Sequence, residues 1–124
     1  MRIIIAGSRN FNNYAVLKHN VINILLILSP AQEPNVEIVS GTARGADQLG
    51  ERFAKEYEYN VKKFPAQWDL YGKFAGYRRN EQMALYAKED WGILIAFWDG
   101  ISKGTKHMIN LAKKHGLRVF VIET

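Results

Sequence analysis

The sequence predicts an α/β fold with three layers, in which helices cover both faces of a mostly parallel sheet of about five strands. Short runs of β-branched and apolar residues alternate with segments of helical period along the whole chain. This alternation is typical of parallel strands joined by right-handed helical crossovers. The 124 residues, of which 48% are hydrophobic, are enough for one buried core, so we expect a single domain over residues 1–124.

The first half of the chain is expected to form three strands and two helices. Their expected ranges are strand 2–6, helix 16–28, strand 36–39, helix 46–57 and strand 61–64. The first strand is a continuous apolar run ended by Gly7, which indicates burial on both faces. Pro30 and Pro34 mark the loop after the first helix, and Pro65 stops the third strand.

The second half is expected to begin with a polar-aromatic loop and then to alternate helix and strand twice. The expected ranges are loop 66–72, helix 75–88, strand 91–97, a last helix that includes 105–112, and strand 117–122. Gly116 ends the last helix. Ligands of such sheets bind beyond the carboxyl ends of the strands, where the strand order reverses, so we expect a site on the loops after the first four strands.

The charge and the residue content narrow the possible partners. A net charge of +5 favours anionic partners, but the basic residues are scattered and form no dense arm for nucleic acid. The chain has no cysteine, which excludes disulfides and thiolate metal sites. The longest apolar stretch, 21–28, is interrupted by Asn23 and is too short to span a bilayer, and no signal peptide is visible. We therefore expect a cytoplasmic protein with no metal and no membrane partner.

The strongest functional signal is the glycine-rich stretch between the second strand and the second helix. Its candidate ligand-binding residues are Ser40, Gly41, Thr42, Arg44, Gly45 and Asp47. Glycines let the backbone approach a phosphate, and free N–H groups hold the anion, although an ordinary strand-to-helix turn favours similar residues. Arg44 can form bidentate bonds with an oxyanion. Asp47 can cap the helix, hold Arg44 or accept hydrogen bonds from a ribose.

Two further loops extend this candidate site. The segment Gly7-Ser8-Arg9 offers a glycine turn, a hydroxyl and a guanidinium, although Ser8 and Arg9 are equally ordinary as a turn residue and a surface charge. A second glycine-rich turn follows the fourth strand and leads into a helix. Its candidate residues are Asp99, Gly100, Ser102, Gly104 and Thr105. Two such turns can hold a phosphate at each end of a ligand, or one phosphate from both sides.

The third strand and the next helix add aromatic and basic side chains. Trp68 is either part of an aromatic wall for a base or a core residue that pins its loop, and we favour the core role. Arg79 lies where its helix begins to pack inward, so we expect it to point into the site, the alternative being an ion pair with Glu81 or Asp99. His107 is near the second glycine turn, where we favour a packing or surface role over acid–base chemistry.

These motifs resemble those of the SLOG superfamily, a Rossmann-like group that includes the DNA-processing protein A family and the Lonely-guy enzymes. The chain looks closest to the YspA-like branch, known mainly as a domain of unknown function in bacteria and phages. The resemblance covers nearly the whole chain and is carried by the segments 7–9, 40–47, 64–68, 76–83 and 98–105. It implies a Rossmann-like fold, a nucleotide-type pocket that includes Asn80, and a homodimer, because members of the superfamily commonly pair.

The Lonely-guy enzymes cleave the base from a nucleoside 5′-monophosphate, so the resemblance also implies candidate catalytic residues. Their Arg-Lys-x-x-Met helix is similar to 79–83, with asparagine in place of lysine, and their Gly-Gly-x-Gly-Thr-x-x-Glu turn is similar at 104–105. Met108 stands at the glutamate position and can neither stabilise a sugar cation nor move a proton. A hydrolase would therefore use Asp99 as its acid or base, with Arg79 holding the phosphate.

Three functions follow, and binding of a nucleotide or nucleotide-derived ligand ranks first. The residues expected around the ligand are Arg9, Arg44 and Arg79 at the phosphate, Asp47 or Asp99 at the ribose, and Trp68 or Trp98 beside the base. The second function is hydrolysis of an N-glycosidic or phosphate bond in the same pocket. The third is single-stranded nucleic-acid binding, by analogy with the DNA-processing family. No cofactor is expected.

Overall fold

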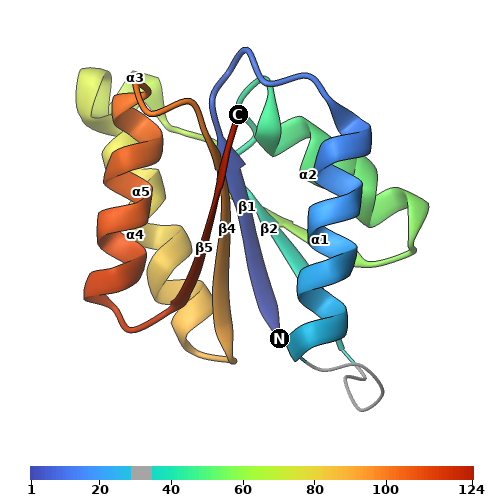
Figure 1. The fold of residues 1–124 in the computed structure, drawn as a ribbon. Helices are drawn as coiled ribbons and strands as arrows, with labels where there is room; N and C mark the ends of the chain where they lie inside the picture. Colours follow the sequence, from blue (N-terminus) through green and yellow to red (C-terminus); the bar gives the residue numbers. More distant parts are fainter. Residues whose placement is uncertain (29–34) are drawn as a thin grey trace.

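The computed structural model describes residues 1–28 and 35–124, so the expected loop prolines Pro30 and Pro34 lie outside the described residues. The described residues form a five-stranded sheet with the strand order β3-β2-β1-β4-β5 (Figure 1). All neighbouring strands pair in parallel, which confirms the expected α/β fold. The strands are β1 (Arg2–Gly7), β2 (Glu37–Ser40), β3 (Asn60–Lys63), β4 (Gly92–Trp98) and β5 (Arg118–Glu123).

The helices follow the strands in the predicted order. The four longer ones are α1 (Tyr14–Leu28), α2 (Ala46–Glu56), α4 (Ala75–Lys88) and α5 (Lys103–Lys114). Helix α4 begins and ends at the predicted residues, whereas β4 begins one residue later than predicted. The reason is Trp91, whose φ of 47° takes it out of the extended conformation that a strand requires.

Strand β1 lies at the centre of the sheet, where Ile3 pairs with Ile38 of β2 on one side and with Ile93 of β4 on the other. The chain passes outward from β1 through β2 to β3, and then returns past β1 to β4 and β5 (Figure 1). The strand order therefore reverses between β1 and β4. Open parallel sheets bind their ligands beyond the carboxyl ends of the strands at this position.

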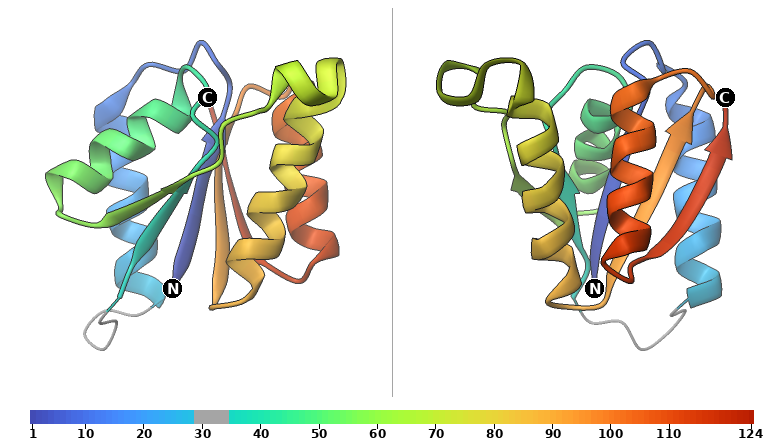
Figure 2. Two further views of the ribbon diagram at one scale, coloured as in Figure 1. Left: turned by 180° about the vertical axis from the view of Figure 1, so that it is seen from behind. Right: turned by 90° about the vertical axis from the view of Figure 1, so that its left-hand side faces the viewer.

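The helices cover the sheet in pairs, with α1 and α2 on one face and α4 and α5 on the other (Figures 1 and 2). Strand β1 contributes to both cores, because successive side chains of a strand point to opposite faces. Ile3 and Ile5 pack in the core under α1 and α2, and Ile4 and Ala6 pack in the core under α4 and α5. All four are buried, as the continuous apolar run predicted.

The segment 66–72, which we expected as a loop, is partly helical. It contains the short helix α3 (Trp68–Tyr71), which leads into a 3-10 turn, η1 (Gly72–Phe74). Figure 2 shows this segment projecting from the body of the protein at the start of α4. The favoured core position of Trp68 is wrong, because its side chain is 52% exposed. A helix of one turn has no face long enough to bury, and none of its residues is buried.

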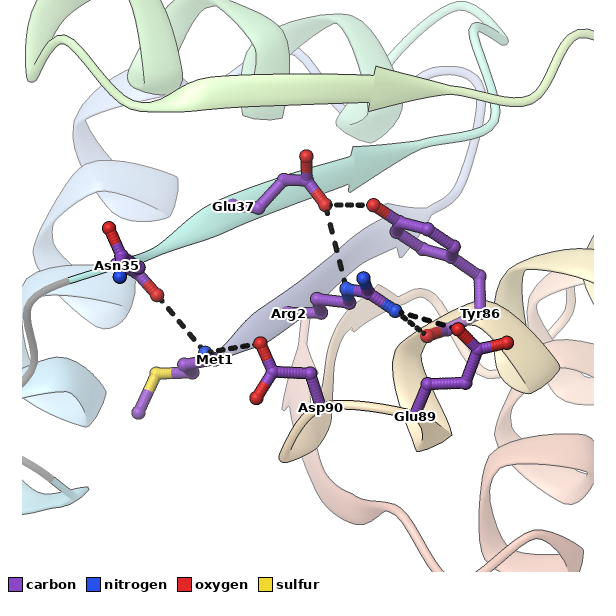
Figure 3. A network of polar contacts seen from close by, with 7 residues as sticks. All are labelled: Met1, Arg2, Asn35, Glu37, Tyr86, Glu89 and Asp90. Atoms are coloured by element: carbon purple, nitrogen blue, oxygen red, sulfur yellow. Dashed lines mark hydrogen bonds and ion pairs between the residues drawn. The ribbon is translucent and has the colours of Figure 1, made fainter.

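At the amino ends of the strands, Arg2 joins β1 to β2 and α4 (Figure 3). Its Nη1 donates to the Tyr86 carbonyl oxygen at 2.6 Å and lies 3.3 Å from Glu89 Oε1. Its Nε lies 3.7 Å from Glu37 Oε1, and the Tyr86 hydroxyl donates to the same carboxylate. The charge of Arg2 is therefore balanced by groups within the fold.

Candidate functional site

Three loops meet at the carboxyl ends of β1, β2 and β4 and hold one another in place. The Ser8 hydroxyl accepts a hydrogen bond from the Asp99 amide at 3.3 Å, and the Ser8 amide donates to the Phe97 carbonyl at 3.1 Å. Gly45 has a φ of 79°, and a Cβ atom there would collide with the carbonyl oxygens of Ser8 and Arg9. A glycine at this position therefore allows the loop after β2 to pack against the loop after β1.

The turn after β2 uses its own side chains to fix its backbone. The buried Ser40 hydroxyl accepts from the Thr42 amide at 3.0 Å and donates to Glu51 Oε2 at 2.6 Å. Asp47 Oδ2 accepts from the Ala43 amide at 3.1 Å. Two of the backbone N–H groups that we expected to be free for a phosphate are therefore bonded within the turn.

Thr42 lies in a strained part of the same turn. Its φ is 64°, a conformation that β-branched residues rarely adopt. Such strain persists only where surrounding contacts impose it, and it is concentrated at ligand-binding segments. The hydrogen bond from the Thr42 amide to Ser40 is one such contact, and Thr42 lines a hollow between this turn and Trp68.

Asp47 is a buried carboxyl at the floor of the site, with 6% of its surface exposed. Burial raises its pKa to about 6, against the opposing effects of the Ala43 amide and the Arg79 charge. A Cβ atom on Gly41 would lie 2.8 Å from both Asp47 Oδ2 and Arg79 Nη1, so a larger residue at this position would displace these side chains. Asp47 thus faces Arg79, and it caps the turn through Ala43 rather than holding Arg44.

Arg79 reaches from α4 to the turn after β2. Its Nη1 donates to the Gly41 carbonyl, and its Nε donates to Asn80 Oδ1 at 3.0 Å. These contacts take the place of the ion pairs with Glu81 or Asp99 that the sequence left open. Burial lowers the pKa of Arg79, while the Asp47 carboxyl opposes that shift.

Hollows of about 270, 440 and 80 Å³ at this end of the sheet share lining residues. Arg9 lines each of them, Arg44 lines the first and second, and Arg79 lines the first and third. The first extends to Trp68, and the third reaches the floor at Asp47. We call these three neighbouring hollows, which Arg9, Arg44 and Arg79 line, the arginine cleft.

The loop after β4 forms the start of α5. Asp99 Oδ1 accepts from the amides of Ser102 and Ile101, both at 2.8 Å, and these bonds lower the pKa of the Asp99 carboxyl. Ser102 caps α5, because its hydroxyl accepts from the Thr105 amide at 3.3 Å. An ionised Asp99 is suited to holding the turn or accepting a ligand hydroxyl, and poorly suited to donating a proton.

Comparison with known proteins gives the family. A family model described as "YspA, cpYpsA-related SLOG family" matches residues 1–71, which is more than half of the chain. The chain belongs to this SLOG family. The resemblance to the YspA-like branch is therefore confirmed. The matched residues include the loops after β1 and β2 and also Trp68, whereas the loop after β4 lies beyond them.

This SLOG chain also has a relative in a phage. The "Gene 61 protein" of Mycobacterium phage D29 is 36% identical over 87 residues, which cover 66% of this chain and 67% of the phage protein. No solved structure matches the chain.

The structure divides the candidate residues of this SLOG site into two groups. Those that line the arginine cleft are Gly7, Ser8, Arg9, Gly41, Thr42, Arg44, Asp47, Trp68, Arg79, Asn80, Asp99, Ser102, Gly104 and Thr105. Ser40, Gly45 and Gly100 do not line these hollows. Ser40 is buried under its turn, Gly45 packs against the loop after β1, and Gly100, with a φ of 81°, shapes the turn after β4.

Sequence reasoning assigned no ligand contact to five further lining residues. They are Ala6, Asn10, Ala43, Ala66 and Met83. Asn10 directly follows Arg9, and this position in the same loop was the signal that could have found it. Met108, at the position of the Lonely-guy glutamate, is 1% exposed and lines the third hollow with an uncharged side chain.

In the part of this SLOG chain that the structure describes, no group of three or more His, Cys, Asp or Glu side chains is placed to hold a metal ion. Among the same residues, every helix is too short or too polar to cross a membrane.

Proposed function

We propose that this chain binds a nucleotide or nucleotide-derived ligand through its phosphate in the arginine cleft. The observation that carries the proposal is the placement of Arg9, Arg44 and Arg79 around one cleft at the reversal of strand order. Within residues 1–28 and 35–124, neither Arg9 nor Arg44 forms a hydrogen bond or an ion pair. Guanidinium groups without partners favour an anion such as a phosphate.

Other residues of the cleft suit the remaining parts of a nucleotide. Trp68 is half-exposed and lines the first hollow, where its indole offers a stacking face for a base. Gly104 lines the second and third hollows and lies in the first turn of α5, where amides without helical partners and the helix dipole favour a phosphate. Asp99 lines the same hollow, and an ionised carboxylate can accept a hydrogen bond from a ribose hydroxyl.

A thermal-shift assay with AMP, ADP, ATP, GMP, UMP and cyclic AMP tests the proposal. At least one nucleotide should raise Tm in proportion to the logarithm of its concentration, because it binds only the folded chain. The double substitution of Arg9→Ala and Arg44→Ala should abolish that rise.

A matched control removes the same charge elsewhere. Lys113 and Lys114 lie in the last turn of α5, at the other end of the sheet from the cleft. Replacing both by alanine should leave the nucleotide-dependent rise in Tm intact. No rise with any of the nucleotides, or an equal loss in the lysine control, would contradict the proposal.

The two alternative functions require different assays. A hydrolase would release free base or phosphate from a nucleotide and lose this activity on Asp99→Ala. A single-strand binder would retard an oligonucleotide in a gel, and the retardation would weaken steeply as salt rises. The amides bonded to Asp99 and the apolar side chain of Met108 favour ligand binding over hydrolysis.

A further inference from the structure

Asn80 is a buried amide at the junction of α4 with the first turns of α5, and it is 6% exposed. Its Oδ1 accepts from Arg79 Nε at 3.0 Å. Its Nδ2 donates to the Gly104 carbonyl at 3.3 Å and lies 3.2 Å from His107 Nδ1. One side chain therefore connects an arginine of the cleft with two residues of α5.

These contacts decide which atom of the amide faces which neighbour. Arg79 Nε can only donate and the Gly104 carbonyl can only accept, so Oδ1 must face the arginine and Nδ2 must face the glycine. Nδ2 can then donate to His107 only where Nδ1 carries no proton. In this arrangement His107 is neutral, with its proton on Nε2.

The surroundings of His107 favour the neutral ring. Burial lowers the pKa of the imidazole, and the Glu81 carboxylate on α4 opposes this shift. The ring of Tyr77, also on α4, packs against the imidazole with 4.3 Å between the ring centroids. On α5 itself, Lys103 and Lys106 are the charged residues within one turn before His107, and both side chains are exposed.

The two groups that hold Arg79 by hydrogen bonds are uncharged. One is the Gly41 carbonyl and the other is the Asn80 side-chain amide, whereas the Asp47 carboxyl acts on Arg79 through its charge. A carboxylate at position 80 would also accept from Nε, but it would neutralise the guanidinium. Uncharged acceptors fix the direction of Arg79 and leave its charge for a ligand anion.

We infer that Asn80, supported by a neutral His107, is the positioning residue that aims Arg79 at the anion bound in the arginine cleft. The inference rests on the proposed function, because it concerns how the same cleft holds its phosphate. The inference also implies that the protonation state of His107 determines whether Arg79 Nε keeps its acceptor. A proton on Nδ1 opposes the Nδ2 hydrogens of Asn80, so the amide must turn, and Arg79 Nε then loses its acceptor.

NMR on the ligand-free protein tests whether His107 and Asn80 hold Arg79 in place. The ¹⁵N shifts of the imidazole report which nitrogen carries the proton, and hydrogen exchange of Arg79 Nε–H reports its hydrogen bond. We expect the Nε2–H form of His107 at neutral pH. As His107 takes up a proton, Arg79 Nε–H should exchange faster relative to its intrinsic rate.

His107→Gln is the informative variant, because its amide oxygen can accept from Asn80 but cannot be protonated. In this variant the exchange of Arg79 Nε–H should follow its intrinsic rate over the whole titration. His107→Lys, which can only donate, should expose Arg79 Nε–H at every pH. An exchange rate of Arg79 Nε–H that ignores the protonation of His107 overturns the inference.

Calorimetry with AMP tests the effect on binding. Asn80→Asp should weaken AMP binding about tenfold or more, because it neutralises Arg79 and removes a donor to Gly104. In the parent, AMP binding should weaken as the pH falls and His107 takes up a proton. His107→Gln should keep the parent affinity at neutral pH and should not show this weakening. Asp47 and the AMP phosphate also titrate near pH 6. The effect of His107 is therefore the difference between His107 and His107→Gln, both measured in an Asp47→Asn background, because the phosphate titrates equally in the two.

Helix α1 offers a matched control, because Asn23 Nδ2 lies 3.1 Å from His19 Nε2 on the exposed surface. Asn23→Asp and His19→Gln should leave AMP affinity unchanged. If AMP does not bind although Arg79 Nε–H responds to His107, the positioning role stands and the proposed function fails for AMP. If AMP binds equally well to the parent and to Asn80→Asp, the inference fails and the proposed function stands.

Discussion

The two ends of the sheet use arginine in opposite ways. At the amino ends, Arg2 contacts the Glu37 and Glu89 carboxylates and the Tyr86 carbonyl, and its guanidinium lies 3.7 Å from the centre of the Tyr86 ring (Figure 3). At the carboxyl ends, Arg9 and Arg44 line a cleft without a hydrogen bond or ion pair to any described residue. Arg2 stabilises the fold through its ion pairs, whereas Arg9 and Arg44 have no such partners and can bind a ligand.

The arginines at the two ends differ because the neighbouring carboxylates have different hydrogen-bond partners. At the amino ends, the Glu37 and Glu89 carboxylates are directed at Arg2. At the carboxyl ends, Asp47 accepts from the Ala43 amide, and Asp99 accepts from two amides of its own turn. The carboxylates of the cleft thus make their hydrogen bonds to backbone amides, and among the described residues neither forms an ion pair with Arg9, Arg44 or Arg79. An anion site can therefore contain carboxylates, provided that these accept hydrogen bonds from backbone amides and do not pair with the arginines.

The largest expected effect is on ligand binding. Replacing both Arg9 and Arg44 by alanine should weaken AMP binding about a hundredfold or more, since each charge-assisted hydrogen bond contributes about 1.5–3 kcal/mol. Arg2→Ala should bind AMP like the parent. Calorimetry at one fixed salt concentration measures both. Equal losses in the two variants would remove the functional distinction between the two ends.

The next effect concerns Asp47, whose pKa is raised to about 6 by burial. A raised pKa stabilises the fold at pH values below the unfolded-state pKa, and this contribution is lost as pH rises through about 6. Asp47→Asn keeps an acceptor for the Ala43 amide and does not titrate. It should therefore raise the free energy of unfolding by up to about 3 kcal/mol above pH 6, and by nothing below about pH 4. Urea denaturation across this range measures it, and a gain that is equal at all pH values would show that titration of the Asp47 carboxyl is not its cause.

Arg2 should matter for stability more than Arg44 does. Arg2→Met removes one donor to the Tyr86 carbonyl and the positive charge beside the Glu37 and Glu89 carboxylates, which should lower the free energy of unfolding by about 1–2 kcal/mol. Arg44→Met, on an exposed side chain without partners among the described residues, should change it by less than about 0.5 kcal/mol. Urea denaturation of the two variants at neutral pH is the measurement, and the reverse ranking would refute the comparison.

The smallest expected effect is at Thr42, with its φ of 64°. Thr42→Gly removes the strain but adds backbone entropy to the unfolded chain, so the net gain in stability should be about 0.5 kcal/mol. Thr42→Ala keeps a Cβ atom and should gain less. Urea denaturation of both variants is the measurement, and a loss of stability in Thr42→Gly would show that the turn is not strained.

The regular elements of the fold could be predicted because their signals are local. The apolar run 2–6 predicted a strand buried on both faces, and the helical spacing within 75–88 predicted α4 at its observed bounds. The short helix that begins at Trp68 could not be predicted, because one helical turn without side-chain caps shows no period. Trp91 likewise gave no sign of its positive φ, which depends on the close turn between α4 and β4.

The loops of the candidate site could be located, but the direction of many of their side chains could not. Glycine-rich turns after parallel strands place Arg9 and Gly104 at one end of a sheet from topology alone. Ser40 belongs to the same motif, yet it is buried and bonded to Glu51, a partner one turn inside α2. The contact between Asn80 and His107 depends on how α4 packs against α5, which no local pattern encodes.

The central place of β1 has a consequence for the chain during its synthesis. Ile4 pairs with Val39 early in the sequence, whereas its other partner, Leu94, is made much later. Until β4 emerges, one edge of β1 remains an unpaired row of backbone groups flanked by apolar side chains, which favours aggregation of the nascent protein. The same event brings the Asp99 amide to Ser8. Protection of the nascent edge and completion of the cleft therefore occur together.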